Sequence, residues 1–288
     1  MLALIAVSIL WAFSFGLIKG QLTGIDSTLV ATIRLLLCAL IFIPWLKAPL
    51  YTTKRFQLMA LGAIQFGVMY LAYIQAYQYL PGYLVAVFTI LTPLYVMIFS
   101  ALFNRQLSLT KLMPVLLSII GAAVIVYRAP NAEKWLVGFL ILQLANIAFA
   151  FGQVSYQQFG MRLSSTNKES KSTHVENMAF MFLGAALLTS AISLINGSFA
   201  EVVDITQSQW LVLLYLGVIA SGFGFCLWNY GALGVSDSHL AIMNNGYIPL
   251  AVIFSLTMFG ESAELSKLAI GGIIIVVSLF WSEKLSKR

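Results

Sequence analysis

Three carboxamide side chains share one face of an uncharged apolar stretch, residues 142–156. Gln143, Asn146 and Gln153 are spaced by three and seven positions, which places them on one side of a helix. Amides in hydrocarbon either hydrogen-bond to neighbouring helices or line a path for a polar solute. Three amides on one face exceed what a single interhelical bond needs. We therefore expect Asn146 and Gln153 to line a substrate-binding cavity.

Tyrosines recur on another apolar stretch at helical spacing. Tyr70, Tyr73 and Tyr77 are three and four positions apart. Together they offer aromatic walls and hydroxyl groups, which suit an amphipathic or cationic ligand. Tyr77 lies near the end of the stretch and is typical of an interfacial aromatic belt. Tyr70 and Tyr73 lie deeper, and their positions fit cavity lining and helix packing equally well.

Two apolar stretches contain residues that break a helix. Asn244 and Asn245 precede Gly246 and Pro249, and Thr89 stands 156 positions before Asn245, just ahead of Pro93. Paired breaks in corresponding helices indicate a binding site near the middle of the membrane. The alternative is a simple proline kink without a ligand. We expect Thr89, Asn244 and Asn245 to belong to the site.

Polar and aromatic residues of two further stretches complete the candidate binding site. Trp11 and Ser14 share a helical face, and Trp228 and Asn229 lie inside the eighth apolar stretch. Arg34 is an intramembrane cation, which is a functional candidate by default. Its closeness to the outer interface instead favours a structural role, in which it reaches the interface or bonds to carbonyls.

Other chemistry is not indicated. All ten acidic residues fall in loops or at span ends, so none lies where it would relay protons or hold sodium. The sequence has no metal-ligand spacing and no catalytic motif, so we expect no enzyme activity, no metal and no cofactor. The net charge of +6 comes from a few cations in short loops. That pattern fits the bilayer surface and not nucleic acid.

The composition indicates a membrane protein. Only 9% of the 288 residues are charged, against about 25% in soluble domains. Ten apolar segments can be counted, and a polar loop is expected over residues 162–177. The segments are approximately 1–19, 27–46, 56–78, 82–103, 111–127, 135–160, 177–195, 209–230, 238–259 and 265–282. The predicted fold is an all-α polytopic membrane protein with ten transmembrane helices.

The second half of the sequence repeats the first. Ala148-Phe-Ala-Phe-Gly152 repeats Ala12-Phe-Ser-Phe-Gly16, and Pro93 and Pro249 differ by the same 156 positions as Lys111 and Lys267. Because each copy holds five spans, an odd number, the second copy must enter the membrane inverted. Inverted repeats are typical of secondary transporters. We predict repeats over residues 1–129 and 130–288.

The cations predict an orientation in the inner membrane. With both termini in the cytoplasm, eleven lysines and arginines face the cytoplasm and four face the other side. The eleven are Lys47, Lys54, Arg55, Arg105, Lys111, Arg162, Lys168, Lys171, Lys284, Lys287 and Arg288. The four are Lys19, Arg128, Lys134 and Lys267.

The order of these motifs resembles the drug/metabolite transporter superfamily, EamA type. The resemblance covers nearly the whole chain. It rests on Trp11-Ala-Phe-Ser-Phe-Gly16, Arg34-Leu-Leu-Leu37, Pro93, Pro249, Gly260-Glu261, Ile120-Gly-Ala-Ala123 and Gly271-Gly-Ile-Ile274. The first half departs from the family pattern, with Asn104-Arg105 where Gly-Glu is usual.

The resemblance implies transport of a small metabolite, and we expect alternating access through a central cavity. An amino acid or related compound is the leading candidate, with export as the expected direction. A carrier of nucleotide-linked or lipid-linked sugar is an alternative, but phosphates favour several deep cations. A receptor or scaffold that does not transport is the other alternative, although an inverted repeat has no obvious use there.

Overall fold

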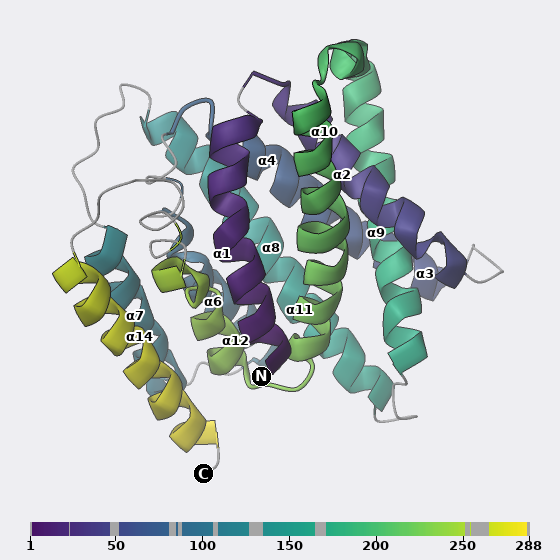
Figure 1. The fold of residues 1–288 in the computed structure, drawn as a ribbon. Helices are drawn as coiled ribbons and strands as arrows, with labels where there is room; N and C mark the ends of the chain where they lie inside the picture. The colour runs from purple at the N-terminus through teal and green to yellow at the C-terminus, as the bar shows by residue number, and fades with distance from the viewer. Residues whose placement is uncertain are drawn as a thin grey trace.

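The protein is a bundle of long helices, shown in Figure 1. The computed structural model describes residues 2–22, 24–46, 52–80, 85, 88–105, 109–126, 135–164, 171–250, 254 and 265–286. No strand occurs among these residues. The N-terminal end of α1 and the C-terminal end of α14 lie at the same end of the bundle (Figure 1).

The first half of the chain forms helices within each of its apolar segments. They are α1 (Leu2–Gln21), α2 (Ser27–Phe42) with a 3₁₀ turn η1 (Ile43–Trp45), α3 (Thr53–Gly62), η2 (Ala63–Val68), α4 (Met69–Ala76), α6 (Thr92–Asn104) and α7 (Leu109–Val126). The side chain of Asp26 accepts a hydrogen bond from the Leu29 N–H and caps α2.

The second half continues in the same way. Its elements are α8 (Trp135–Ser164), α9 (Lys171–Asn196), η3 (Ser198–Asp204), α10 (Gln207–Leu214), η4 (Tyr215–Phe223), α11 (Gly224–Ala232), α12 (Asp237–Met243) and α14 (Leu265–Ser286). The expected loop at 162–177 is wrong at both ends, because α8 runs to Ser164 and α9 begins at Lys171. His174 and Asn177 are buried in the first turns of α9, so packing extends this helix beyond its apolar residues.

Five of the described helical stretches are long and apolar enough to cross a membrane. They are Ser27–Trp45, Thr53–Ala76, Trp135–Phe159, Thr173–Asn196 and Gln207–Ala232. Shorter apolar helices cover Leu2–Ser14, Thr92–Asn104 and Leu109–Val124. The protein is therefore an all-α membrane protein.

Two of these helices widen into π-helical turns near their middle, at η2 and η4. A π-helical turn leaves backbone carbonyls without their usual partners, and such turns are frequent at functional sites. Side chains use the carbonyls of η4: Trp11 Nε1 donates to the Ala220 oxygen at 2.9 Å. Within η4 itself, Ser221 Oγ donates to the Leu216 oxygen at 2.7 Å.

Helices of the two halves pack against each other. α7 lies beside α14, α2 beside α9, and α6 beside α12; Figure 1 shows the α7–α14 pair at the edge of the bundle. The main buried core contains stacked aromatic rings. Phe66 lies between Phe182 and Phe225, with ring centroids 5.2 and 4.6 Å away. This core holds η2, α9 and α11 around the middle of the molecule.

Candidate functional site

A cavity of about 110 Å³ lies between the helices. Its walls come from α1, α2, α4, α8 and α11, from residues just before and at the start of α6, and from residues just after α12. The described lining residues are mostly aromatic or uncharged polar. They are Trp11, Ser14, Ile18, Arg34, Met69, Tyr70, Tyr73, Thr89, Thr92, Ala145, Asn146, Phe149, Phe225, Asn244 and Tyr247.

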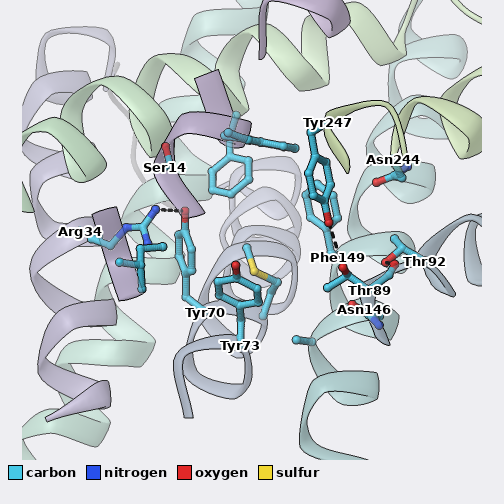
Figure 2. A pocket seen from close by; sticks show the side chains of 15 residues that line it. Ser14, Arg34, Tyr70, Tyr73, Thr89, Thr92, Asn146, Phe149, Asn244 and Tyr247 are labelled. Atoms are coloured by element: carbon cyan, nitrogen blue, oxygen red, sulfur yellow. Dashed lines mark hydrogen bonds between the residues drawn. The ribbon is translucent and has the colours of Figure 1, made fainter. Parts of the chain in front are cut away.

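One side of the cavity carries a guanidinium group. Figure 2 shows Arg34 of α2 next to Tyr70 of α4, with Ser14 nearby. Arg34 Nη2 donates to Tyr70 Oη at 2.6 Å and to Ser221 Oγ at 3.0 Å. Arg34 Nε also approaches Ser221 Oγ, at 3.3 Å. The guanidinium carbon lies 4.2 Å from the centre of the Tyr70 ring.

The local fold fixes these two hydroxyl groups. Ser221 is in η4, and the hydrogen bond of its hydroxyl to the Leu216 carbonyl sets its rotamer. Ser221 Oγ and Tyr70 Oη lie 2.8 Å apart, so the two hydroxyls also bond to each other. The Nη1 atom of Arg34 is buried and has no hydrogen-bond partner among the described residues. Arg34 is 3% exposed, so it does not reach the interface as the sequence suggested.

The opposite side of the cavity carries amides and hydroxyls. In Figure 2, Thr89, Asn146, Asn244 and Tyr247 lie across the cavity from Arg34. Thr89 Oγ1 and Tyr247 Oη are 2.9 Å apart. Thr89 precedes α6, and Tyr247 follows the turn at residues 244–246 that ends α12. The helix breaks expected near Pro93 and Pro249 are therefore present, and they meet at this wall.

The Asn146 amide is held by the break before α6. Its Nδ2 atom donates to the Phe88 carbonyl at 2.9 Å and to Gln143 Oε1 at 3.2 Å. Gln143 Nε2 also donates to the Phe88 carbonyl, at 3.3 Å. Both of these Asn146 bonds are made by the nitrogen, and the side chain lines the cavity. Asn146 therefore presents a carbonyl acceptor to the cavity.

Aromatic rings join the two polar sides. The Trp11 ring packs on Phe149 and Phe225, with centroid distances of 5.9 and 5.2 Å. Met69 and Tyr73 extend this apolar surface along α4. Rings of this kind bury the apolar part of a ligand while the polar groups orient it.

Seven of the eleven residues that the sequence nominated for the site line the cavity. They are Trp11, Ser14, Tyr70, Tyr73, Thr89, Asn146 and Asn244. Their role in binding stays a prediction.

The other four nominated residues are buried outside the described lining. Gln153 Oε1 accepts from Trp228 Nε1 at 2.9 Å, and Asn229 Oδ1 accepts from Gln65 Nε2 at 2.9 Å. These pairs stabilise helix contacts, which the amide-packing alternative predicted. Asn245 is fully buried, and neither side-chain polar atom has a partner among the described residues.

Several lining residues were not assigned to the site from the sequence, and the most important is Arg34, for which the sequence favoured a structural role. Its signal was present, because a cation inside an apolar stretch is rare and costly. Phe149 belongs to the repeated Ala148-Phe-Ala-Phe-Gly152 motif, whereas Phe225 and Tyr247 had no distinguishing signal among 20 phenylalanines and 12 tyrosines. No cluster of three or more potential metal ligands occurs in the described ranges. Among the described lining residues, none is acidic.

Comparison with known proteins shows which family the chain belongs to. The sequence pattern of the EamA-like transporter family matches residues 1–127 and 136–282. A solved crystal structure covers 100% of this chain and 98% of its own, with a TM-score of 0.76 at 18% identity, which shows a shared fold.

Curated relatives match over nearly the whole chain. The biotin transporter of Salmonella typhimurium is 37% identical over 99% of this chain and 93% of its own. The probable biotin transporter of Pseudomonas aeruginosa is 36% identical over 99% and 98%, and the biotin transporter of Escherichia coli K12 is 36% identical over 99% and 93%. These matches, together with the apolar helices, place the chain in the inner membrane as a multi-pass protein. The chain belongs to the EamA-like transporter family of the drug/metabolite transporter superfamily, and it is a transporter of a small metabolite and not an enzyme.

Proposed function

We propose that this protein transports biotin. The observation that carries the proposal is the cavity, with polar groups on two opposite sides and aromatic rings between them. Biotin has the same order of groups: a ureido ring, an apolar thiolane and alkyl chain, and a carboxylate. Three relatives that are 36–37% identical over 99% of the chain carry the name of this substrate.

The lining residues suit each part of the solute. The ureido group has N–H donors and a carbonyl acceptor, and the Asn146 carbonyl and the Thr89–Tyr247 hydroxyls can bond to both kinds. Trp11, Phe149 and Phe225 can cover the thiolane ring. The residues would therefore replace the hydration of the solute without binding any part of it covalently.

Other substrates fit the cavity less well. An amino acid carries an ammonium group, which would need an acidic partner, and the described lining offers none. The names of the relatives also give no support to amino-acid export. A nucleotide-linked or lipid-linked sugar carries phosphates, for which Arg34 is the one cation in the described lining.

The proposed mechanism is alternating access by two inverted five-helix repeats, residues 1–129 and 130–288, with both termini cytoplasmic. The two-part family match supports this division. The π-helical segments support it as well, because an offset of 156 residues carries η2 onto residues 219–224, which overlap η4. The packing of α7, α2 and α6 on α14, α9 and α12 fits a two-fold axis through the cavity.

A flux assay tests the function. Purified protein in liposomes should take up radiolabelled biotin with saturable kinetics, and excess unlabelled biotin inside should accelerate the uptake. Protein-free liposomes give the background. An Asn146→Leu variant that folds normally should show reduced flux. If wild-type protein leaves biotin flux at background while it moves another metabolite, biotin is the wrong substrate.

A further inference from the structure

In the described part of the chain, the buried Arg34 lacks the counter-charge that such a group needs. A guanidinium keeps its charge in proteins, and a buried charge is costly unless it is paired. Among the described residues its side-chain partners are the neutral hydroxyls of Tyr70 and Ser221. By contrast, Arg55 does form an ion pair, since its Nη2 atom lies 2.8 Å from Glu176 Oε1. Arg34 therefore lies in the cavity wall with a charge that no described residue neutralises.

The arrangement differs from that of a structural arginine. A purely structural guanidinium would have all its nitrogen atoms bonded, to carbonyls or to a carboxylate. Here Nε and Nη2 are held by hydroxyls, while the buried Nη1 has no partner in the described chain. The two hydroxyls leave the positive charge in place, because neither can neutralise it. The guanidinium is therefore held in one orientation, while its charge and its Nη1 atom lack a partner in the described chain.

We propose that Arg34 binds the carboxylate of the transported solute, and that Tyr70 and Ser221 position the guanidinium for this contact. The proposal rests on the proposed function and adds to it the substrate class, a free monocarboxylate with an apolar body. A carboxylate would supply both the missing charge and the missing acceptor in one group. Aromatic rings adjoin this side, so the apolar body of the same molecule can follow the carboxylate into the cavity.

The proposal makes a specificity prediction. Esters and amides of the same acid keep the ring and alkyl chain but lose the charge. The wild-type protein should therefore bind biotin roughly 10- to 100-fold more tightly than biotin methyl ester or biotinamide, the range expected for a charge-assisted hydrogen bond. Lipoate has a different ring and the same kind of carboxylate, and it should bind more tightly than lipoamide.

Equilibrium binding to the full chain in nanodiscs tests the assignment. Arg34→Gln should weaken biotin binding roughly 10- to 100-fold and leave the methyl ester nearly unchanged, so that the two ligands bind alike. Tyr70→Phe and Ser221→Ala should each weaken biotin by a smaller factor. Arg55→Gln is the matched control, an arginine outside the cavity, and should leave both affinities unchanged.

A melting curve separates anchoring from a structural role. If Arg34 is an anchor, Arg34→Gln without ligand should melt at the wild-type temperature or above it, because an unpaired buried charge is removed. Biotin at the same concentration should then raise the melting temperature of wild type clearly more than that of the variant. Equal loss of biotin and ester binding, together with a lower melting temperature, would overturn the proposal.

The two proposals can fail separately. If biotin does not bind but lipoate or another monocarboxylate does, and Arg34→Gln removes that binding, the substrate name is wrong and the carboxylate anchor stands. If wild-type protein binds biotin and its ester equally, the proposed Arg34–carboxylate contact is wrong, and biotin remains the proposed substrate. If none of the carboxylates in the panel binds, the anchor is wrong as well.

Discussion

At the residue scale, the side-chain amide of Asn146 both stabilises a helix contact and lines the cavity. Its nitrogen donates to the Phe88 carbonyl, and its side chain lines the cavity. Asn146→Leu should weaken biotin binding by about 1–3 kcal/mol, because an unsatisfied ureido group would then be buried. The fold should lose less, since Gln143 Nε2 still donates to the Phe88 carbonyl. Binding and melting temperature, measured on the same preparation, test both statements.

Asn229 gives the matched control for this amide. It is fully buried, bonds to Gln65 and lies outside the described lining. Asn229→Leu leaves the Gln65 amide without its partner, so the melting temperature should fall while the affinity for biotin stays unchanged. The opposite pattern, with Asn146→Leu affecting only stability, would remove Asn146 from the binding site.

Helical spacing predicted which side chains share a face, but not which helix covers that face. Asn146 and Gln153 lie seven positions apart on α8, yet one lines the cavity and the other bonds to Trp228 and Asn244. Arg34 shows a different limit. Its distance from the end of the span suggested the interface, but η4 places Ser221 beside it and keeps it buried. Such contacts depend on tertiary packing, which periodicity does not encode.

At the element scale, the crossing of α3 and α9 depends on glycine. A Cβ atom on Gly62 would lie 2.0 Å from the Met181 carbonyl oxygen, and one on Gly184 would lie 2.0 Å from that of Met59. Small residues allow this close backbone approach, which favours helix association in membranes. The crossing in turn supports η2, whose Phe66 and Gln65 anchor the aromatic core and Asn229.

Gly184→Ala should therefore separate these helices. The nearest atoms are backbone atoms, which cannot rotate away, so we expect a loss of about 1–3 kcal/mol or more in stability. Gly272→Ala is the control, because a Cβ atom there meets no atom within 4 Å. It should leave the melting temperature unchanged or raise it, since alanine favours the helix. Equal melting temperatures for wild type and Gly184→Ala would contradict the close crossing.

The helix breaks show what sequence can predict for elements. Asn244 to Gly246 and Thr92-Pro93 were expected to interrupt their helices, and in the structure α12 ends at Met243 while α6 begins at Thr92. Proline and glycine act on the backbone locally, so their effect is readable from the sequence. The start of α9 was not readable, because burial of His174 against Tyr156 extends that helix into polar residues.

At the scale of the whole molecule, the orientation in the membrane can be tested directly. The start of α1 and the end of α14 lie at the same end of the bundle, and the cation distribution favours the cytoplasm on that side. Reporters fused after Arg288 and inserted between Ser164 and Lys171 should both report the cytoplasm, since the four predicted spans between the two positions are an even number. Signals from opposite sides of the membrane would contradict the ten-span inverted-repeat arrangement, and periplasmic signals from both reporters would contradict the predicted orientation.

Ser100, Asn104, Gln158 and Asp237 form a polar cluster outside the cavity lining. Ser100 Oγ donates to the Asp237 carboxylate, and Asn104 Nδ2 lies 3.3 Å from the same group. Gln158 Nε2 donates to Asn104 Oδ1 at 3.1 Å. Along α8, Asn146 lines the cavity, and Gln158 lies about three turns further toward this cluster. The cluster therefore joins α6, α8 and α12 below the cavity.

The proposed alternating access would separate α6 from α12 at this cluster in the other state of the carrier, so a covalent bond across the cluster should stop transport. In a background with Cys38 and Cys226 replaced, Ser100→Cys combined with Asp237→Cys should form a disulfide under oxidation, because the native side chains already touch. Biotin flux into liposomes should then stop, and a reductant should restore it. Binding should persist, because the cluster lies outside the cavity lining. Each single variant, treated with the same oxidant, controls for loss of the native hydrogen bond. Full flux through the cross-linked protein would show that these helices need not separate during transport.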